Sequence, residues 1–216
     1  MLNDIVCKCR KCPRLVDFRE SIEQKKAYHN EKYWKKPVPG YGSQDSEIFL
    51  IGLAPSAHGG NRTGRIFTGD LSGDFLMESL YLEKMASQPN SDYLADGLKL
   101  YNIYMSAAVK CVPPKNMPSK SEEVSCFPYL VSEFSLLKKV NRVLVLGKLA
   151  HGSYLRFLKE KNINVKGVKF IHGRHYEFEN MPTLFCSYHP SPQNTNTGKL
   201  TQNNFRKLLK TVKNYC

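Results

Sequence analysis

The stretch EIFLIGLAPSAHGGNRTGRIFTGDLSGDF, residues 47–75, joins a short apolar run to a long glycine-rich loop. The apolar part, residues 47–54, ends in glycine and proline signals and is typical of a buried strand. The loop, residues 52–75, holds six glycines, two arginines, two aspartates and one histidine. A connection of this length between a strand and a helix is uncommon unless it carries a function. We therefore expect this loop to form part of a binding or catalytic site.

Apolar strands alternate with helices along the rest of the chain, and this alternation indicates an α/β domain with a mostly parallel sheet. Further strands are expected at residues 100–111, 142–147 and 182–190, with an antiparallel or edge pair at 167–178. Helices are expected at residues 13–23, 74–86, 148–161 and 200–215, and one that begins at Ser119 or Ser121.

In parallel sheets of this kind, ligands bind beyond the carboxyl ends of the strands. Three loops leave such ends here, at residues 54–75, 112–118 and 189–201. Most of the unusual polar residues of the chain lie in these three loops, so we expect the functional site where they meet.

The chain of 216 residues fits one domain, residues 1–216, with a hydrophobic core of its own. Its net charge of +13 favours a polyanionic partner, above all nucleic acid. A lysine-rich solvated surface, as in proteins from hot environments, is the plainer alternative. No apolar run approaches the ~20 residues of a membrane span, and the N-terminus has no signal-peptide core. We therefore expect a cytoplasmic, nucleoid-associated protein.

The cysteines are unevenly placed, and two pairs stand out. Cys9 and Cys12 are separated by two residues in a tight turn, and Cys111 and Cys126 form a later pair. Four thiolates suit either tetrahedral zinc or a cubane iron–sulfur cluster, and spacing alone does not choose between them. Free buried cysteines are the alternative.

The remaining three cysteines are weaker candidates. Cys7 is a ligand candidate by proximity only, whereas Cys9 has the better spacing to Cys12. Cys186 lies in an apolar strand and is expected in the core. Cys216 is the last residue and is expected to be frayed.

Four residues in the loops are candidates for chemistry or its support. Asp70 and Asp74 are the only acids of the glycine-rich loop. Asp74 suits the first turn of the next helix, where the dipole favours it, so Asp70 is the better catalytic candidate. His189 stands where a strand ends, and Asn116 follows two prolines that stiffen the backbone. The structural alternatives are a packed histidine and a simple turn.

Polar donors in two of the loops are candidates for contacts with phosphate, through side chains or backbone N–H groups. Arg62 and Arg65 are also compatible with ordinary surface charges, and Pro192 with Gln193 could wedge into a stack of bases. The predicted DNA contacts are Asn61, Arg62, Arg65, Ser191, Gln193, Asn194 and Thr195.

These residues together resemble a known family. The segments CRKCPRLVDFRE, GLAPSAHGGNRTGRIFTGDLSGDF, AAVKCVPPKN, VLVLG and SYHPSPQNTNTGKLT match the uracil-DNA glycosylase superfamily, and within it the iron–sulfur branch called family 5. The resemblance implies a three-layer α/β/α fold with a four-stranded, mostly parallel central sheet. It also implies a [4Fe–4S] cluster on Cys9, Cys12, Cys111 and Cys126, with residues 7–20 as the N-terminal ligand segment and zinc as the alternative metal.

The resemblance further implies a monofunctional DNA glycosylase that flips a deaminated base out of DNA and initiates base excision repair. Asp70 would stabilise the cationic sugar and orient water, and His189 would donate to the leaving base. Asn116 would hold water or the base, and Phe67 would stack on the flipped base.

The base site implied by the resemblance also departs from that of better-known branches. Gly52, Ala54 and Ala107 would line it, with Ala54 near the place of an acid and Ala107 at the place of a base-reading Asn. A site without that amide is expected to accept hypoxanthine, and xanthine as a further candidate, beside uracil.

Other classes of protein are compatible with part of the pattern. The main alternative is a non-catalytic nucleic-acid-binding protein with a structural metal cluster. A nucleotide-binding enzyme would need a phosphate loop, and GGNRTGR lacks its Lys-Ser/Thr pair. A bifunctional lyase would need an amine nucleophile, for which Lys110 and Lys115 are weak candidates. The expected partner is double-stranded DNA with damaged bases, with single-stranded DNA as a further candidate, bound by a monomer.

Overall fold

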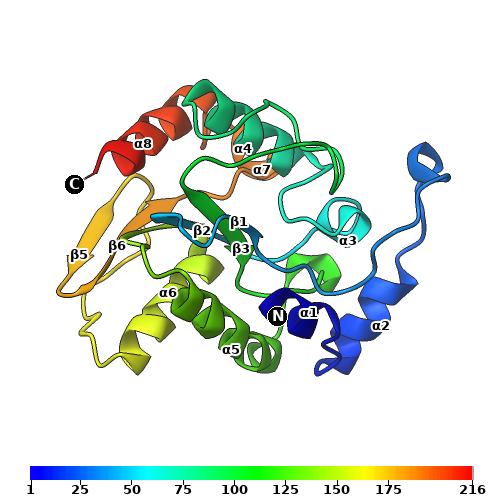
Figure 1. Ribbon diagram of the computed structural model, residues 1–216, viewed down its shortest axis with the longest axis horizontal. Helices are drawn as coiled ribbons and strands as arrows, with labels where there is room; N and C mark the ends of the chain where they lie inside the picture. The colour runs from blue at the N-terminus through cyan, green and yellow to red at the C-terminus, as the bar shows by residue number, and fades with distance from the viewer. Residues whose placement is uncertain (216) are drawn as a thin grey trace.

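The computed structural model describes residues 1–215, and the expectation for Cys216 lies outside the described residues. Six strands of the described chain form one sheet with the order β1-β3-β2-β4-β6-β5, and helices cover both of its faces (Figure 1). The strands are β1 (Tyr41–Gly42), β2 (Ile48–Gly52), β3 (Ile103–Ala107), β4 (Arg142–Leu146), β5 (His175–Phe178) and β6 (Met181–Ser187).

The sheet is larger than the four strands we expected. The four central strands β3, β2, β4 and β6 are parallel, as predicted, and β1 and β5 add one antiparallel strand at each edge. The segment 167–178, where the sequence predicts a pair of strands, contains one strand, β5, which pairs antiparallel with β6. β1 has only two residues, in a segment where the sequence predicts a loop, and two residues are too few to show a period.

The long helices lie where the sequence pattern predicts them, and the short ones were missed. α5 begins after Ser119, whose hydroxyl accepts from the Glu122 N–H in a capping box. Single turns such as α3 are too short to carry a helical period. The helices are α1 (Leu2–Cys7), α2 (Pro13–Ser21), η1 (Lys26–Tyr28), α3 (Gly60–Thr63), α4 (Leu71–Leu82), η2 (Pro114–Asn116), α5 (Lys120–Leu136), α6 (Lys148–Glu160), α7 (Pro192–Thr195) and α8 (Gln202–Asn214).

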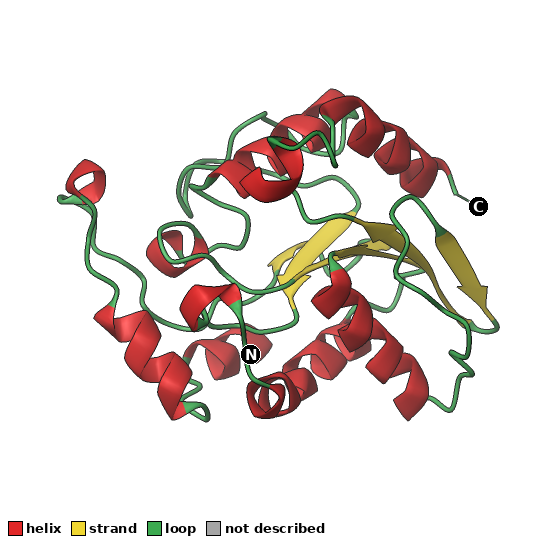
Figure 2. Cartoon of the chain, turned by 180° about the vertical axis from the view of Figure 1, so that it is seen from behind, coloured by secondary structure: helices red, strands yellow, loops and turns green. Residues whose placement is uncertain are grey.

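The two faces of the sheet bury separate apolar layers, which gives the expected three-layer α/β/α arrangement. α4 and α8 pack on one face, α5 and α6 on the other, as the view from behind also shows (Figure 2). Along β2, Leu50 faces α4 and α8, whereas Phe49 and Ile51 face α5 and α6. All five residues of β2 are buried, as expected for a central parallel strand. No helix of the described residues is long and apolar enough to cross a bilayer.

The carboxyl ends of the parallel strands meet at one edge, and this is where the three polar loops leave the sheet. Gly52 at the end of β2 pairs with Ala107 at the end of β3. The Gly147 N–H, just after β4, donates to the Ser187 carbonyl at the end of β6 over 2.8 Å. The sheet therefore brings residues that are far apart in the sequence to a single edge, as predicted.

Candidate active site

Asp70 is held at the start of α4 by two hydrogen bonds. One carboxylate oxygen, Oδ1, accepts from the Gly73 N–H over 2.9 Å and caps the helix. The other, Oδ2, accepts from the hydroxyl of Ser56. This capping role was not predicted, although an aspartate directly before a helix is a common cap. Nor was Ser56 predicted, although its position just beyond β2 could have suggested it.

Gly59 makes room for this arrangement. A Cβ atom on Gly59 would lie 2.1 Å from Asp70 Oδ2 and 2.4 Å from Ser56 Oγ. The Gly59 N–H donates to Ser56 Oγ over 3.0 Å, which leaves the hydroxyl hydrogen free to point at Asp70. The carboxylate is therefore oriented by a short chain of donors that begins in the backbone of the glycine-rich loop.

Phe67 lies over the end of β2, where a Cβ atom on Gly52 would approach its ring to 2.6 Å. Its backbone has φ of 52°, an uncommon conformation for a bulky residue. The ring is 5% exposed, and its centre is 6.1 Å from that of the His189 ring. Phe67 is therefore placed beside the candidate catalytic residues, with only a small part of its ring open to a ligand.

His189 follows β6 and shares this edge of the sheet with Asp70. Desolvation lowers the pKa of His189, although the negative charge of Asp70 acts in the opposite direction. The imidazole is therefore neutral at neutral pH, with one N–H to donate. The Asn194 amide donates to the His189 carbonyl over 2.8 Å and fixes the backbone that carries the ring.

The other residues predicted to surround the base are less closely connected to Asp70 and His189. Ala107 is buried beside Gly52, and Ala54 is partly exposed in the loop after β2. Asn116 is exposed on the η2 turn with φ of 56°, and no contact among the described residues joins it to Asp70 or His189. The structure thus unites Asp70, Phe67 and His189, and leaves Asn116 on a separate turn.

The loop after β6 contains the one-turn helix α7. Ser191 precedes it, and its carbonyl accepts from the Asn194 N–H over 2.8 Å and from the Thr195 hydroxyl over 3.3 Å. Gln193 is exposed, whereas Ser191, Asn194 and Thr195 are partly buried. Gln193 is therefore the member of this group whose side chain is most open to a ligand.

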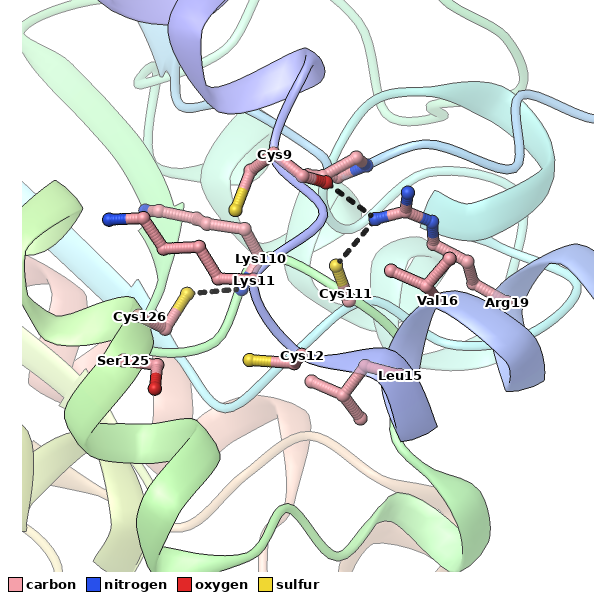
Figure 3. Close-up of a pocket in the computed structure, with 11 residues that line it drawn as sticks. Cys9, Lys11, Cys12, Leu15, Val16, Arg19, Lys110, Cys111, Ser125 and Cys126 are labelled. Carbon is pink, nitrogen blue, oxygen red and sulfur yellow. Dashed lines mark hydrogen bonds between the residues drawn. The ribbon is translucent and has the colours of Figure 1, made fainter.

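The four predicted ligand cysteines line one cavity, and their sulfur atoms face it from different sides (Figure 3). Cys9 and Cys12 come from the turn before α2, Cys111 from beyond β3, and Cys126 from α5. Cys7 is not among the residues that line this cavity. No group of three or more His, Cys, Asp or Glu side chains among residues 1–215 is arranged as a site for a single metal ion.

Buried donors point at the sulfur atoms. The guanidinium of Arg19, which is 2% exposed, donates to Cys111 Sγ over 3.1 Å and to the Cys9 carbonyl over 3.2 Å. The Lys110 N–H donates to Cys126 Sγ over 3.2 Å. Burial raises the pKa of Cys126 to about 12, so this thiol keeps its proton unless a cation replaces it.

Three of the predicted DNA contacts point into the protein instead. Asn61 is 1% exposed, and its amide donates to the Arg19 carbonyl over 3.1 Å. Arg62 is buried, and its guanidinium donates to the His58 carbonyl and to Glu31. Arg62 is therefore not a free surface charge, because the chain itself supplies acceptors for its guanidinium.

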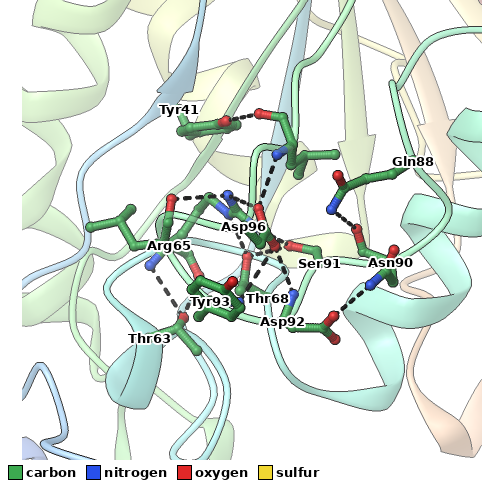
Figure 4. A network of polar contacts seen from close by, with 12 residues as sticks. Tyr41, Thr63, Arg65, Thr68, Gln88, Asn90, Ser91, Asp92, Tyr93 and Asp96 are labelled. Atoms are coloured by element: carbon green, nitrogen blue, oxygen red, sulfur yellow. Dashed lines mark hydrogen bonds and ion pairs between the residues drawn. The ribbon is translucent and has the colours of Figure 1, made fainter.

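Arg65 is the most fully occupied of the three (Figure 4). Its guanidinium makes two hydrogen bonds to the Asp96 carboxylate and three more to Thr68, Ser91 and the Leu94 carbonyl. These bonds use all five of its N–H donors. Arg65 therefore ties the glycine-rich loop to the loop before β3, and has no donor left for a phosphate.

Asp96 completes this network from the other side. Burial raises its pKa, but the hydrogen bonds from Arg65 and from the N–H groups of Leu98 and Asp92 outweigh that effect and leave the pKa lowered. The charged form of Asp96 therefore stabilises the fold. This contribution is complete above the ordinary aspartate pKa and is lost as the pH falls through the lowered value.

Replacing Asp96 by Asn should reduce the free energy of unfolding by about 3 kcal/mol at neutral pH, because it leaves the buried Arg65 without its counter-charge. The difference from wild type should shrink as the pH falls below the ordinary aspartate pKa of about 4 toward the lowered native value, because Asp96 takes up a proton in the unfolded chain before it does so in the folded protein. Urea unfolding at a series of pH values measures both effects.

The exposed pair of Asp45 with Lys139 provides the matched control. Asp45→Asn removes the same charge at the surface and should change stability by less than about 1 kcal/mol. Equal losses in the free energy of unfolding in the two variants would show that burial does not make the Arg65–Asp96 pair more stabilising than a surface pair.

The comparisons with known proteins agree with this geometry. A family model described as the uracil DNA glycosylase superfamily matches residues 39–213, which include Asp70, Phe67 and His189. The type-5 uracil-DNA glycosylase of Thermus thermophilus is 43% identical over 206 residues, 95% of this chain and 92% of that protein. The type-5 enzymes of Mycobacterium leprae and Pyrobaculum aerophilum are 41% and 38% identical, over 93% and 94% of this chain and 88% and 86% of their own lengths.

The family model matches most of the chain, and the sequence identities to the three relatives are 38% to 43%. Both indicate a closer relationship than a shared fold alone. The family model also covers the glycine-rich loop and the loop after β6, two of the segments on which the resemblance was based. The chain belongs to the uracil-DNA glycosylase superfamily, a family of hydrolases that act on N-glycosyl bonds, and within it to the type-5 branch.

Proposed function

We propose that this protein hydrolyses the N-glycosidic bond of uracil in DNA, leaves an abasic site and thereby begins base excision repair. The observation that carries this proposal is the meeting of an oriented carboxylate, Asp70, and a neutral imidazole, His189, at one edge of the sheet. The basic character of the chain, with a net charge of +13, agrees with DNA as the substrate.

The reaction separates charge, and Asp70 and His189 suit the cation and the anion that it produces. Breaking the bond leaves a cationic, oxocarbenium-like sugar and an anionic base. Asp70 would stabilise the cation and orient the attacking water, with Ser56 holding the carboxylate in place. His189 would donate its N–H to the negative charge that develops on the base.

The target atom of such a reaction is hidden inside a duplex, so the nucleotide must leave the base stack first. Unstacking costs least at a mispair, and deaminated bases are mispaired. Phe67, which lies between Gly52 and His189, would then contact the face of the flipped base. Asn116 would hold water or the base from its separate turn, and the loop after β6, with Gln193 at its surface, would contact phosphates.

The base site is built from small residues, which supports a wider range of substrates. Gly52 and Ala107 pair at the carboxyl edge, and Ala54 follows Gly52 in the loop. None of the three side chains can donate to or accept from the edge of a base. We therefore extend the proposal to hypoxanthine and to xanthine.

The bonding of Lys110 and the position of Lys115, the two candidate amine nucleophiles, favour hydrolysis without a lyase step. Lys110 is 1% exposed, and its ammonium is bonded to the Glu133 carboxylate, to Ser106 and to the Ala107 carbonyl. A lysine whose Nζ is fully bonded in this way is no nucleophile. Lys115 is exposed on the η2 turn, with no contact among the described residues to Asp70 or His189.

The cysteine cavity is suited to the [4Fe–4S] cluster implied by the resemblance. In a cubane each thiolate binds a different iron, so sulfur atoms spread around a cavity are appropriate, whereas zinc draws four sulfurs to within about 2.3 Å of one centre. Cys9, Cys12, Cys111 and Cys126 would hold the cluster, and the buried cation of Arg19 would offset its negative charge. When bound, the group would crosslink the N-terminal turn to β3 and α5, a structural task.

The first prediction from the proposed function concerns Asp70. The Asp70→Asn variant should lose most of its single-turnover base release, because an amide carries no negative charge to stabilise the sugar cation. Duplexes with uracil, hypoxanthine or xanthine, followed by alkaline cleavage of abasic sites, give the measurement, and wild type should release more than one of these bases.

Asp74→Asn, four residues further along the chain in α4, removes the same charge and should keep most of the activity. Release of uracil alone would contradict the inference from Ala107. DNA binding without any base release would instead favour the non-catalytic binding protein with a structural metal cluster.

The second prediction concerns His189 and pH. His189→Ala should lower the single-turnover rate by about 10² to 10³, the usual effect of removing one donor to a developing anion. Because desolvation lowers the pKa of His189, the wild-type rate should not rise as the pH falls through about 6.5. A rate that increases on acidification, and loses that increase in the variant, would mean that the protonated ring is the active form.

The third prediction concerns the cluster. Purified protein should be brown, absorb near ~400 nm and contain iron and sulfide. Replacing Cys9, Cys12, Cys111 or Cys126 by Ser should reduce the iron content and the absorbance, whereas Cys7→Ser should retain both. Colourless protein with one zinc ion would contradict the cluster and leave the four cysteines as a zinc site.

A further inference from the structure

Residues 24–36 form a segment that stands apart from the body of the protein, and we call it the basic arm. It contains five lysines and one carboxylate, Glu31. In Figure 1 the arm, with η1 at its tip, projects from the end of the molecule that carries α3, and Figure 2 shows the same projection from behind. A charged run is commonly only a solvated surface. The attachment of the arm to the rest of the protein distinguishes it from such a surface.

One side chain of the glycine-rich loop holds the tip of the arm. The guanidinium of Arg62 lies 4.0 Å from the centre of the Tyr28 ring and forms an ion pair with Glu31. The same guanidinium donates to the His58 carbonyl over 2.7 Å and to the Gly69 carbonyl over 3.2 Å. Gly69 directly precedes Asp70, so Arg62 connects the arm to the backbone of the candidate catalytic residue.

The base of the arm is attached to the same loop. The Trp34 and Lys35 N–H groups donate to the carbonyls of Arg62 and Asn61 over 2.9 and 3.0 Å. Tyr33 is buried, and its hydroxyl lies 3.0 Å from His58 Nδ1. The arm is therefore fixed at its tip and at its base to the glycine-rich loop, unlike a freely solvated tail.

The positive charge of the arm is left uncompensated. Lys25, Lys26 and Lys32 are exposed, and no hydrogen bond or ion pair of their ammonium groups is found among the described residues. The one carboxylate, Glu31, is already paired with Arg62. Lys25 also acts on the loop at a distance, since the pKa of His58 is lowered by desolvation and then by the charge of Lys25.

We propose that the basic arm binds backbone phosphates of duplex DNA beside the target nucleotide, through Lys25, Lys26 and Lys32. This inference rests on the proposed function for its substrate, but it names a binding surface separate from the residues that act on the base. Arg62 is then a positioning residue, which sets the phosphate-binding arm in register with Asp70.

The experiment compares two variants with the same change of charge. The arm variant is Lys25→Ala, Lys26→Ala and Lys32→Ala together. The control variant is Lys138→Ala, Lys159→Ala and Lys161→Ala, three exposed lysines near the ends of α5 and α6 at the amino edge of the sheet, opposite the site. Binding to a uracil-containing duplex is measured by fluorescence anisotropy at several salt concentrations, and base release by single turnover at saturating enzyme.

The arm variant should bind at least about tenfold more weakly at ~0.1 M salt, and the slope of log K against log salt should become shallower by about 0.9 for each phosphate that the arm no longer neutralises. Its rate at saturation should equal that of wild type, because the three lysines take no part in the chemistry proposed for Asp70 and His189. The control variant should retain the wild-type salt slope and most of the affinity.

Equal weakening in both variants would overturn the proposal, since it would mean that only net charge matters. So would an arm variant with the affinity and salt slope of wild type. If wild type released no base at all, the proposed function would fail, yet the binding comparison would still decide whether the arm contacts DNA.

Discussion

The ion pair of Arg65 with Asp96 is the constraint on which the candidate site depends. It lies where the glycine-rich loop crosses the loop before β3, and a guanidinium with five satisfied donors allows one relative position of the two. The Gly69 N–H reinforces the crossing by donating to the Ser91 carbonyl over 2.7 Å. A loop with six glycines has much conformational freedom to lose, and these contacts select the conformation in which Asp70 meets Ser56.

Buried cations that are bonded to acceptors of the chain recur in the interior of this basic protein. Arg19, Arg65 and Lys110 are each almost completely buried, and the chain supplies acceptors for all three. Arg19 donates to a carbonyl and to the thiol of Cys111, Arg65 pairs with the carboxylate of Asp96, and Lys110 pairs with that of Glu133. Part of the positive charge thus organises the loops, and the exposed remainder is available to a polyanion. Net charge is therefore an incomplete guide to which cations face the substrate.

Much of the fold follows from the sequence because apolar runs and helix caps are local signals. The buried strand β2 and the capping box at Ser119 are examples. The two-residue strand β1 shows no such signal, since its pairing with β3 is a tertiary contact. In the site, Asp70 and His189 could be located from the ends of strands. The inward direction of Arg62 and Arg65 could not, because nothing local records that Glu31 and Asp96 fold back to meet them.

Asp70 caps α4, and the proposed mechanism would give it a second task that chemistry allows to be separated from the first. As a helix cap it needs only an acceptor oxygen, which asparagine supplies about as well as aspartate, while alanine supplies none. For the sugar cation it needs a full negative charge. An amide at this position should therefore yield a well-folded protein that binds its damaged duplex without releasing the base, which is the material needed to capture the intact complex for crystallography.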